Sequence, residues 1–391
     1  MAIEASKEGG RRRRLRLGMV GGGRGAFIGA VHRIAARLDD RWELVAGALS
    51  SDPERARASG ADLGLSPARS YDGIEAMARR ERRLKDRIDA VAIVTPNFAH
   101  APAAKAFLRA GIHVICDKPL ATSRREAEAL ARLARERGLI FAVTYNYTGY
   151  PLVRQARSMV AAGAIGRIRV VQVEYAQDWL STRLEESGQK QAAWRTDPKR
   201  AGPAGAVGDI GTHAFNLAEF VSCEEVESVA AELHTFVEGR ALDDNAHMML
   251  RFRGGARGML WCSQVAPGNE NNLRLRVYGE TGALEWVQEN PNVLTYTPLG
   301  EPPRLIRRGG AGANEVAAAA TRIPSGHPEG YLEGFAQLYS DIAEQIAARL
   351  EGREPAPLSL QVPGVDDGVR GVRFIEAAVR SAKRGAAWTG V

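Results

Sequence analysis

The stretch Leu15–Gly29, LRLGMVGGGRGAFIG, decides how the first part of this chain folds. A short apolar run ends in a cluster of glycines, and a helical pattern follows over residues 30–38. This order of strand, glycine turn and helix brings backbone N–H groups close to a pyrophosphate, because glycine has no side chain and tolerates positive φ. The sequence therefore predicts a dinucleotide site near its start. The alternative is a glycine-rich turn that binds no ligand.

The glycines of this stretch can be placed on the dinucleotide fingerprint G-x-G-x-x-G. Gly21 and Gly23 take the first two places, and Ala26 takes the third, a substitution that the fingerprint tolerates. A further glycine, Gly29, follows three residues later. We expect cofactor contacts from the loop and the first helical turn, at Gly21, Gly23, Arg24, Phe27 and Ile28.

Strand and helix patterns alternate from residue 15 to about residue 145, which predicts an α/β fold with a doubly wound parallel Rossmann sheet. From residue 151 onward, short strands joined by hairpin turns predict a C-terminal α+β domain with a mostly antiparallel open sheet. We therefore expect three parts, which are a basic disordered tail over 1–14, a dinucleotide-binding domain over 15–148 and a substrate-binding and oligomerisation domain over 149–391.

Composition excludes several classes of protein. The 391 residues suit about two domains, and 45% hydrophobic with 25% charged residues is ordinary for a globular protein. Three widely spaced cysteines argue against a disulfide framework or a zinc site, so no metal is expected. The net charge of +7 lies partly in Arg11–Arg14, which we interpret as a solvated tail rather than a nucleic-acid or membrane contact. Without a membrane span or an apolar signal segment, the cytoplasm is the expected location.

Polar residues at the ends of the next two predicted strands are further candidates for cofactor contacts. Ser50 stands where an acidic residue would bind the adenosine ribose of NAD, and with Arg55 it suits a 2′-phosphate, so the choice between NAD and NADP stays open. After the strand over 88–95, Thr95, Asn97 and His100 lie at the carboxyl edge where ligands bind. The alternative for this segment is a turn with a helix-capping asparagine.

Two segments carry the residues expected to do chemistry. Lys118 follows a strand directly and precedes a proline, which restricts its backbone, so its ammonium is held where it can stabilise an alkoxide. Asp209 and His213 stand four residues apart on a predicted helix and share one face. Histidine is the natural proton acceptor near neutral pH. The alternatives are a surface lysine, a capping aspartate and a buried, satisfied histidine.

Loop residues rich in aromatic and polar groups are candidates for binding a substrate in the cleft between the domains. Aromatic rings stack on sugar rings, and amide, guanidinium and hydroxyl groups hydrogen-bond to them, although each of these residues can equally serve packing or capping. The candidates are Asn146, Tyr147, Trp194, Arg195, His327 and Tyr331.

The glycine loop, Asp117-Lys118-Pro119 and Asp209-x-Gly211-x-His213, in this order and spacing, resemble the Gfo/Idh/MocA family of oxidoreductases over nearly the whole chain. Members usually carry Glu-Lys-Pro where this chain has Asp117. The resemblance implies that Lys118 contacts the reacting hydroxyl and, with Asp117, the cofactor; that His213 is the acid/base; and that Asp209 binds a substrate hydroxyl.

The resemblance also implies an activity and an assembly. We expect an NAD(P)-dependent enzyme that transfers hydride between the nicotinamide and a secondary alcohol of a sugar, a sugar derivative or an inositol-like polyol. A homodimer or homotetramer is expected to form through the outer face of the C-terminal sheet. The alternatives are an NAD-dependent glycosidase that uses transient hydride transfer and a non-catalytic NAD(P)-binding regulator.

Overall fold

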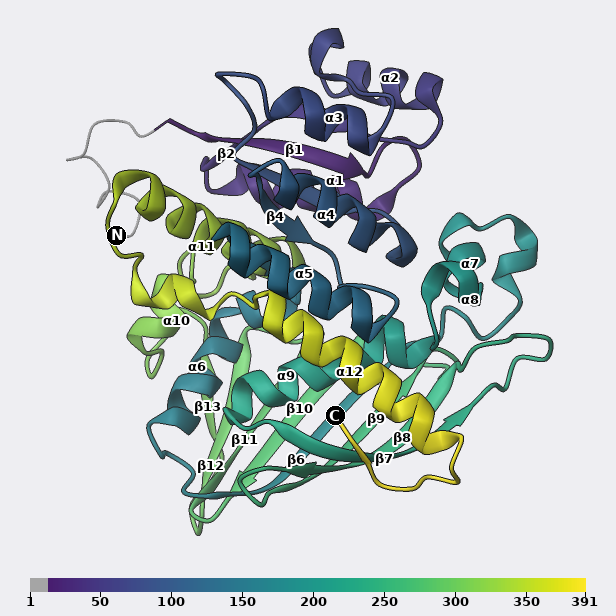
Figure 1. Ribbon diagram of the computed structural model, residues 1–391. Coiled ribbons are helices and arrows are strands. Elements are labelled where there is room, and N and C mark those ends of the chain that lie inside the picture. Colours follow the sequence, from purple (N-terminus) through teal and green to yellow (C-terminus); the bar gives the residue numbers. More distant parts are fainter. Residues whose placement is uncertain (1–12) are drawn as a thin grey trace.

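The computed structural model describes residues 13–391 and contains two sheets with helices packed between and beside them (Figure 1). The first sheet has five parallel strands in the order β2-β1-β3-β4-β5. The second has nine strands in the order β13-β12-β11-β10-β6-β9-β8-β7-β14, and within it only β6 and β9 pair in parallel. The predicted combination of a Rossmann-type sheet and a mostly antiparallel sheet is confirmed.

The predicted basic tail falls mostly on residues 1–12, which lie outside the described residues. Arg13 and Arg14 are described, and both hold ion pairs with the folded domain. Arg13 Nη1 lies 2.7 Å from Asp89 Oδ2, and Arg14 pairs with Asp40. These two residues therefore belong to the domain that follows.

The parallel sheet forms where the sequence predicted it. All five residues of β3 are buried, because helices cover both faces of the sheet. The strand order places β1 beside β3, so that the glycine loop after β1 and the segments after β3 and β4 meet at one edge. The elements are β1 (Leu15–Gly21), α1 (Phe27–Leu38), β2 (Trp42–Ala48), α2 (Pro53–Asp62), α3 (Ile74–Glu81), β3 (Ala90–Val94), α4 (His100–Arg109), β4 (His113–Cys116), α5 (Arg124–Arg137) and β5 (Phe141–Val143).

The glycine loop corrects one detail of the predicted fingerprint. Gly21 and Gly22 have φ angles of 79° and 73°, which favour glycine. Helix α1 begins at Phe27, with Ala26 as its N-cap residue. The close approach of helix to turn falls on Gly29, where a Cβ atom would lie 2.4 Å from the Cα atom of Gly22. The third place of the fingerprint, where a small residue lets the helix pack against the turn, is therefore taken by Gly29 and not by Ala26.

The second sheet is covered by helices on one face, as Figure 1 shows for α6, α9 and α12. A π-helical turn, η5 (Val207–Gly211), leads directly into α9. Strands β12, β13 and β14 were not predicted, and β13 and β14 have only four and two residues. The elements are α6 (Pro151–Ala161), β6 (Ile168–Ala176), α7 (Lys190–Arg195), α8 (Pro198–Ala201), α9 (Thr212–Ser222), β7 (Val226–His234), β8 (Asn245–Phe252), β9 (Arg257–Ser263), β10 (Asn272–Gly279), β11 (Gly282–Val287), β12 (Val293–Pro298), β13 (Arg304–Arg307), α10 (Glu315–Ala319) and β14 (Thr389–Gly390).

The last two long helices connect the two sheets. Phe335 and Leu338 of α11 (Tyr331–Glu351) pack into the same buried cluster as Leu17 of β1. Val372 of α12 (Val365–Ala382) joins the cluster that contains Leu130 of α5. A unit ending at residue 148 would therefore lack part of the apolar surface that buries its own core.

The contact between Gly29 and Gly22 generates a prediction. Gly29→Ala forces the turn and the helix apart, so we expect a loss of about 1–3 kcal/mol in the free energy of unfolding, measured by denaturant titration, and weaker NADH binding. The matched control is Gly73→Ala, because a Cβ at Gly73 meets no atom within 4 Å. Equal stability of the two variants would contradict this account of the turn.

Candidate functional site

Lys118 connects the edge of the parallel sheet to the second part of the chain. It lies two residues after β4, and the bond from Lys118 to Pro119 is cis. Its Nζ atom donates to the backbone oxygen of Asp209 and, at 3.0 Å, to Asp209 Oδ1. Both side chains are mostly buried, with 16% and 15% exposed. Lys118 is therefore a held ammonium, as the sequence predicted, and its holder is Asp209.

Asp209 lies in the π-helical turn η5 and is shared by three donors. Lys118 donates to its Oδ1 atom. Its Oδ2 atom accepts from Arg195 Nε at 3.0 Å and from Gln264 Nε2 at 2.9 Å. Burial alone would raise the pKa of Asp209, but the charges of Arg195 and Lys118 outweigh that effect and hold the pKa well below its usual value. The carboxylate therefore stays ionised.

His213 lies beside this charged pair without a partner of its own. It is buried, its Nδ1 atom has no hydrogen-bond partner, and the rings of Tyr145 and Tyr147 lie 5.7 and 4.9 Å from its ring, centroid to centroid. Burial, reinforced by the positive charge of Lys118, holds the pKa of His213 well below its usual value. The imidazole is therefore neutral near pH 7 and able to accept a proton.

Asp117 has its carboxylate turned toward the Rossmann domain. Its Oδ1 atom accepts from Thr144 Oγ1 at 2.5 Å and lies 3.0 Å from His32 Nε2, whose other ring nitrogen lies 2.8 Å from the Tyr339 hydroxyl. Burial would raise the pKa of Asp117, but His32 and these hydrogen bonds lower it to about 2. Asp117, the residue directly before Lys118, is thus anchored to α1 and to the end of β5.

The segment after β3 differs from the sequence prediction at His100. His100 is fully buried, and its two ring nitrogens lie 2.8 Å from the backbone oxygens of Pro119 and Thr95. No ring nitrogen is left for a cofactor, so the prediction of a cofactor contact at His100 is wrong. The ring instead joins the loops that follow β3 and β4.

The other two residues of this segment face different neighbours. Asn97 is buried and donates through Nδ2 to the backbone oxygen of Ala201, at 2.8 Å. Thr95 has a buried hydroxyl oxygen without a partner, which suits a ligand at the sheet edge. Asn97 therefore fastens α8 to the sheet edge, and the cofactor contact at Thr95 stays a prediction.

The glycine loop leaves open space at Gly25 and at the start of α1. A Cβ at Gly25 would meet nothing within 4 Å, and Phe27 at the start of α1 is 66% exposed, with Ile28 partly buried beside it. On the far side of the loop, Ser50 Oγ accepts from the Asp52 backbone N–H at 3.1 Å, and the Arg55 side chain is exposed. The positive φ angles and the unpartnered Thr95 hydroxyl fit the predicted cofactor.

Four of the predicted substrate residues precede Asp209 in the chain, and two of them contact Asp209 or His213 directly. Arg195 reaches Asp209, and its guanidinium carbon lies 4.2 Å from the centre of the Trp194 ring. Tyr147 contacts His213, and its hydroxyl lies 2.5 Å from that of Tyr175. Asn146 is buried with its Nδ2 atom unpartnered.

The two residues from the C-terminal half differ from each other. Tyr331 packs against the buried cluster that contains Tyr147, the residue in contact with His213, and burial raises the pKa of its hydroxyl. His327 has an exposed side chain, and its backbone oxygen accepts a hydrogen bond from Arg308. The structure therefore gives Tyr331, but not the His327 ring, a connection to the site.

Several site residues carried no usable signal in the sequence. Gln264 directly follows β9, and it reaches Asp209 only because the end of β9 packs against η5. His32 and Tyr175 lie within ordinary helix and strand patterns. Only the periodicity of α1 could have shown that His32 faces inward, and nothing in the chain indicates its partner.

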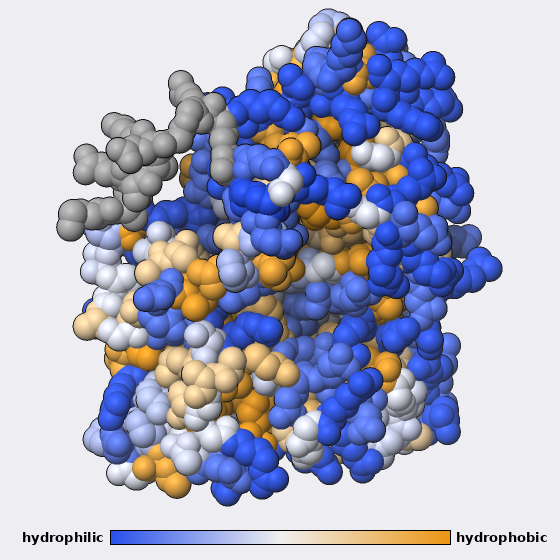
Figure 2. Space-filling view, turned by 60° about the vertical axis from the view of Figure 1, so that its left-hand side comes forward, coloured by the Kyte–Doolittle hydropathy of each residue, from blue (hydrophilic) through white to orange (hydrophobic). Residues whose placement is uncertain are grey.

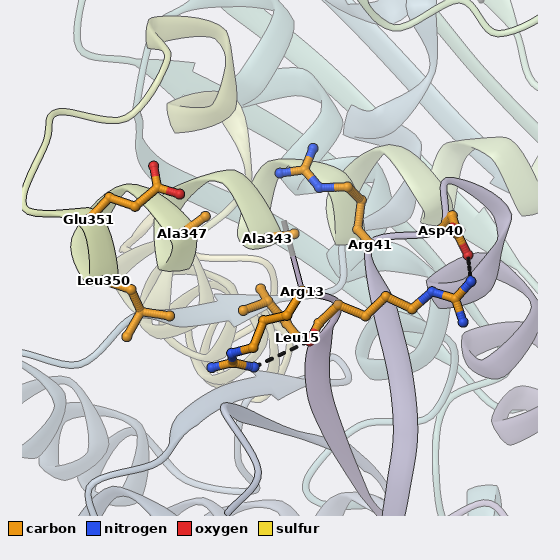
Figure 3. Close-up of a pocket in the computed structure, with 9 residues that line it drawn as sticks. Arg13, Leu15, Asp40, Arg41, Ala343, Ala347, Leu350 and Glu351 are labelled. Atoms are coloured by element: carbon orange, nitrogen blue, oxygen red, sulfur yellow. Dashed lines mark hydrogen bonds and ion pairs between the residues drawn. The ribbon is translucent and has the colours of Figure 1, made fainter. Parts of the chain in front are cut away.

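A cavity of about 320 Å³ lies away from this site (Figure 3). It is at the start of β1, which is the opposite edge of the parallel sheet from Lys118. Arg13 and Arg41 line it together with Ala343 and Ala347 of α11. Lys118, Asp209 and His213 are not among the residues that line it.

Within residues 13–391, no helix is both long and apolar enough to cross a membrane. The same residues contain no cluster of three or more His, Cys, Asp or Glu side chains arranged for a metal ion.

Two family models match the chain along most of its length. Residues 15–145 match the oxidoreductase family with an NAD-binding Rossmann fold, and residues 153–285 match the GFO/IDH/MocA C-terminal domain. Among curated proteins, a levoglucosan dehydrogenase from Pseudarthrobacter phenanthrenivorans is 30% identical over 72% of this chain and 75% of its own.

Solved structures match almost the entire chain. An oxidoreductase from Sinorhizobium meliloti is 56% identical, with a TM-score of 0.88 over 96% of this chain and 99% of its own. An inositol dehydrogenase homolog from Azotobacter vinelandii, complexed with NADH and myo-inositol, is 37% identical, with a TM-score of 0.90 over 97% of this chain and 98% of its own.

The burial of His213 beside Lys118 generates a prediction for its titration. Both effects favour the neutral ring, so we expect its NMR resonance, assigned by comparison with His213→Gln, to titrate below pH 6.5. In Lys118→Met one of the two causes is removed, and the midpoint should rise toward the ordinary value. A wild-type midpoint at or above 6.5 would contradict the described environment.

Proposed function

Because this chain belongs to the GFO/IDH/MocA family of NAD-binding oxidoreductases, we propose that it transfers hydride between a nicotinamide cofactor and a secondary alcohol of a cyclic polyol or sugar. The observation that carries the proposal is the arrangement of a held ammonium, Lys118, beside a neutral and unpartnered imidazole, His213. A group that accepts a proton and a group that stabilises an alkoxide are what alcohol oxidation requires of the protein.

In the oxidative direction, His213 accepts the proton of the substrate hydroxyl. The ammonium of Lys118 stabilises the alkoxide that forms, and because Asp209 already orients this ammonium, little reorganisation accompanies the step. Asp209 has both oxygens engaged by protein donors, yet a carboxylate has about four acceptor positions, so it can also accept from a neighbouring substrate hydroxyl.

The residues present fit a nicotinamide dinucleotide. Gly21 and Gly23 would hold the pyrophosphate at the N-terminus of α1, and the unpartnered hydroxyl of Thr95 lies at the same edge of the sheet. When bound, the nicotinamide supplies the acceptor for the hydride that leaves the carbinol carbon.

The polar lining supports a substrate with several hydroxyl groups. Asn146 has a buried donor without a partner, and Arg195 with Trp194 offers a flat, charged surface. Buried polar groups discriminate strongly between substrates that satisfy them and those that do not. The homologous structure with NADH and myo-inositol, and the related levoglucosan dehydrogenase, support a cyclic polyol or an anhydrosugar as the substrate class.

We also propose that two copies of this chain pair through the outer face of the nine-stranded sheet. Its central strands present large apolar side chains, and Met249 of β8 lies opposite Met259 of β9 in the register, with 55% and 56% exposed. Charged side chains on neighbouring strands, Glu174 and Arg276, border this pair and form an ion pair at 2.8 Å. An apolar centre with a polar border is typical of subunit interfaces.

We propose the cytoplasm as the compartment. Cys116, Cys223 and Cys262 are all free thiols, and the first and third are buried. Free thiols suit a reducing environment.

The proposed activity is tested by screening cyclic polyols and sugars with NAD⁺ and NADP⁺ and following nicotinamide reduction. With the best substrate, Lys118→Ala and His213→Ala should each lower kcat by about 10²- to 10⁴-fold, because each removes one group that acts on the hydroxyl. NADH binding should stay nearly unchanged in His213→Ala. Lys105→Ala, which alters an exposed lysine of α4, is the control. Near-normal turnover in either site variant, or NADH binding without turnover of any alcohol, would contradict the proposal.

The proposed pairing is tested by sedimentation. Met249→Asp and Met259→Asp place charges at the centre of the apolar patch, so we expect the wild-type oligomer to dissociate into smaller species. Leu350→Asp changes a residue of α11 that is 60% exposed and should leave the oligomer intact. A wild-type monomer, or a patch variant that keeps the wild-type mass, would be evidence against this interface.

A further inference from the structure

We infer that Asp62 makes this chain prefer NAD⁺ over NADP⁺ by holding the guanidinium of Arg24 away from a 2′-phosphate. The inference rests on one part of the proposed function, which is the binding of a nicotinamide dinucleotide at the glycine loop. It concerns a residue of α2 that the sequence prediction did not include. The end of β2, where an acidic residue commonly selects NAD, carries Ser50 instead.

Three segments converge at the second glycine of the loop. The backbone N–H of Gly23 donates to the backbone oxygen of Leu49 at 3.1 Å. A Cβ at Gly23 would lie 2.6 Å from that oxygen and 2.6 Å from Ser59 Oγ. The backbone N–H of Arg24 donates to the same Ser59 hydroxyl at 3.1 Å. The loop, the end of β2 and one face of α2 therefore enclose the place where the adenosine ribose binds in this fold.

Arg24 extends from this point to the end of α2. Its Nε and Nη2 atoms donate to the two carboxylate oxygens of Asp62, at 2.5 and 2.7 Å. Ser59 and Asp62 are three residues apart on α2 and so lie on the same face, which is turned toward the glycine loop. The hydrogen bond to Asp62 raises the pKa of Arg24, and the reciprocal effect lowers the pKa of Asp62. Both groups are charged at neutral pH.

The pairing has opposite consequences for the two cofactors. A 2′-phosphate carries close to two negative charges and is bound most often by arginine. To bind it, Arg24 would have to leave Asp62, and the freed carboxylate would then repel the phosphate nearby. The 2′-hydroxyl of NAD⁺ needs neither change. Asp62 therefore supplies, from the other side of the loop, the negative charge that is missing at Ser50.

The ion pair between Arg24 and Asp62 is exposed, so either side chain can be substituted without disturbing the core. The side chains of Arg24 and Asp62 are 57% and 48% exposed, and hydrophilic residues dominate the top of the molecule, where α2 and α3 lie (Figure 2). Exposed ion pairs contribute little to stability, so removing one charge should leave the fold intact. On the same helix, Arg57 pairs with Asp72 at 2.7 Å, with 55% and 57% exposed, and serves as a matched control.

The test is the dissociation constant of NADH and of NADPH for the full chain, measured by calorimetry at one fixed salt concentration. In Asp62→Asn, the Kd of NADPH should fall about tenfold, while that of NADH changes less than twofold. In the double variant Arg24→Gln with Asp62→Asn, the gain for NADPH should disappear. Asp72→Asn should change neither constant.

Two results would overturn the inference. One is an unchanged Kd of NADPH in Asp62→Asn. The other is a gain that persists in the double variant, which would assign the phosphate to Ser50 and Arg55 instead. Because binding alone is measured, a chain that binds NADH but oxidises no polyol would contradict the proposed substrate class without affecting this test.

Discussion

The ion pair between Lys118 and Asp209 is the contact on which the rest of the site depends. Lys118 belongs to the edge of the parallel sheet, and Asp209 belongs to the π-helical turn that precedes α9. Both are mostly removed from water, where removing one partner of such a pair leaves a costly unpaired charge. The pair can form only when the two parts of the chain are folded and docked, and α11 and α12 secure that docking by packing against the core of the first part.

The charges around this pair divide the chemistry between two groups. Arg195, Gln264 and Lys118 share the carboxylate of Asp209, and the charges of Arg195 and Lys118 keep it ionised. His213 lies next to them, its Nδ1 atom has no hydrogen-bond partner among the described residues, and burial together with Lys118 keeps it neutral. Neighbouring groups whose pKa values are moved by different causes take different roles in proton transfer. In the proposed reaction, the aspartate orients Lys118 and the histidine accepts the proton.

Several polar residues near the sheet edge fix the position of the loop that carries Lys118. His100 joins the carbonyls of Thr95 and Pro119, and Asp117 joins Lys118 to His32 of α1. These residues explain why Lys118 sits at a defined position although it lies in a loop. A site in a loop gains precision when its supporting residues are themselves hydrogen-bonded to regular elements.

The sequence by itself determined the two kinds of sheet and the glycine turn, and it singled out Lys118, Asp209 and His213 as candidate site residues. Periodicity, glycine placement and short spacings are local properties, and these residues stand in local patterns that chemistry restricts. Only the tertiary structure decided that Gly29 makes the close approach to the turn, that His100 is turned inward, and that Gln264, His32 and Asp62 face Asp209, Asp117 and Arg24. The last three pairs lie 55, 85 and 38 residues apart along the chain, and no local pattern encodes which side chains a fold brings together across such distances.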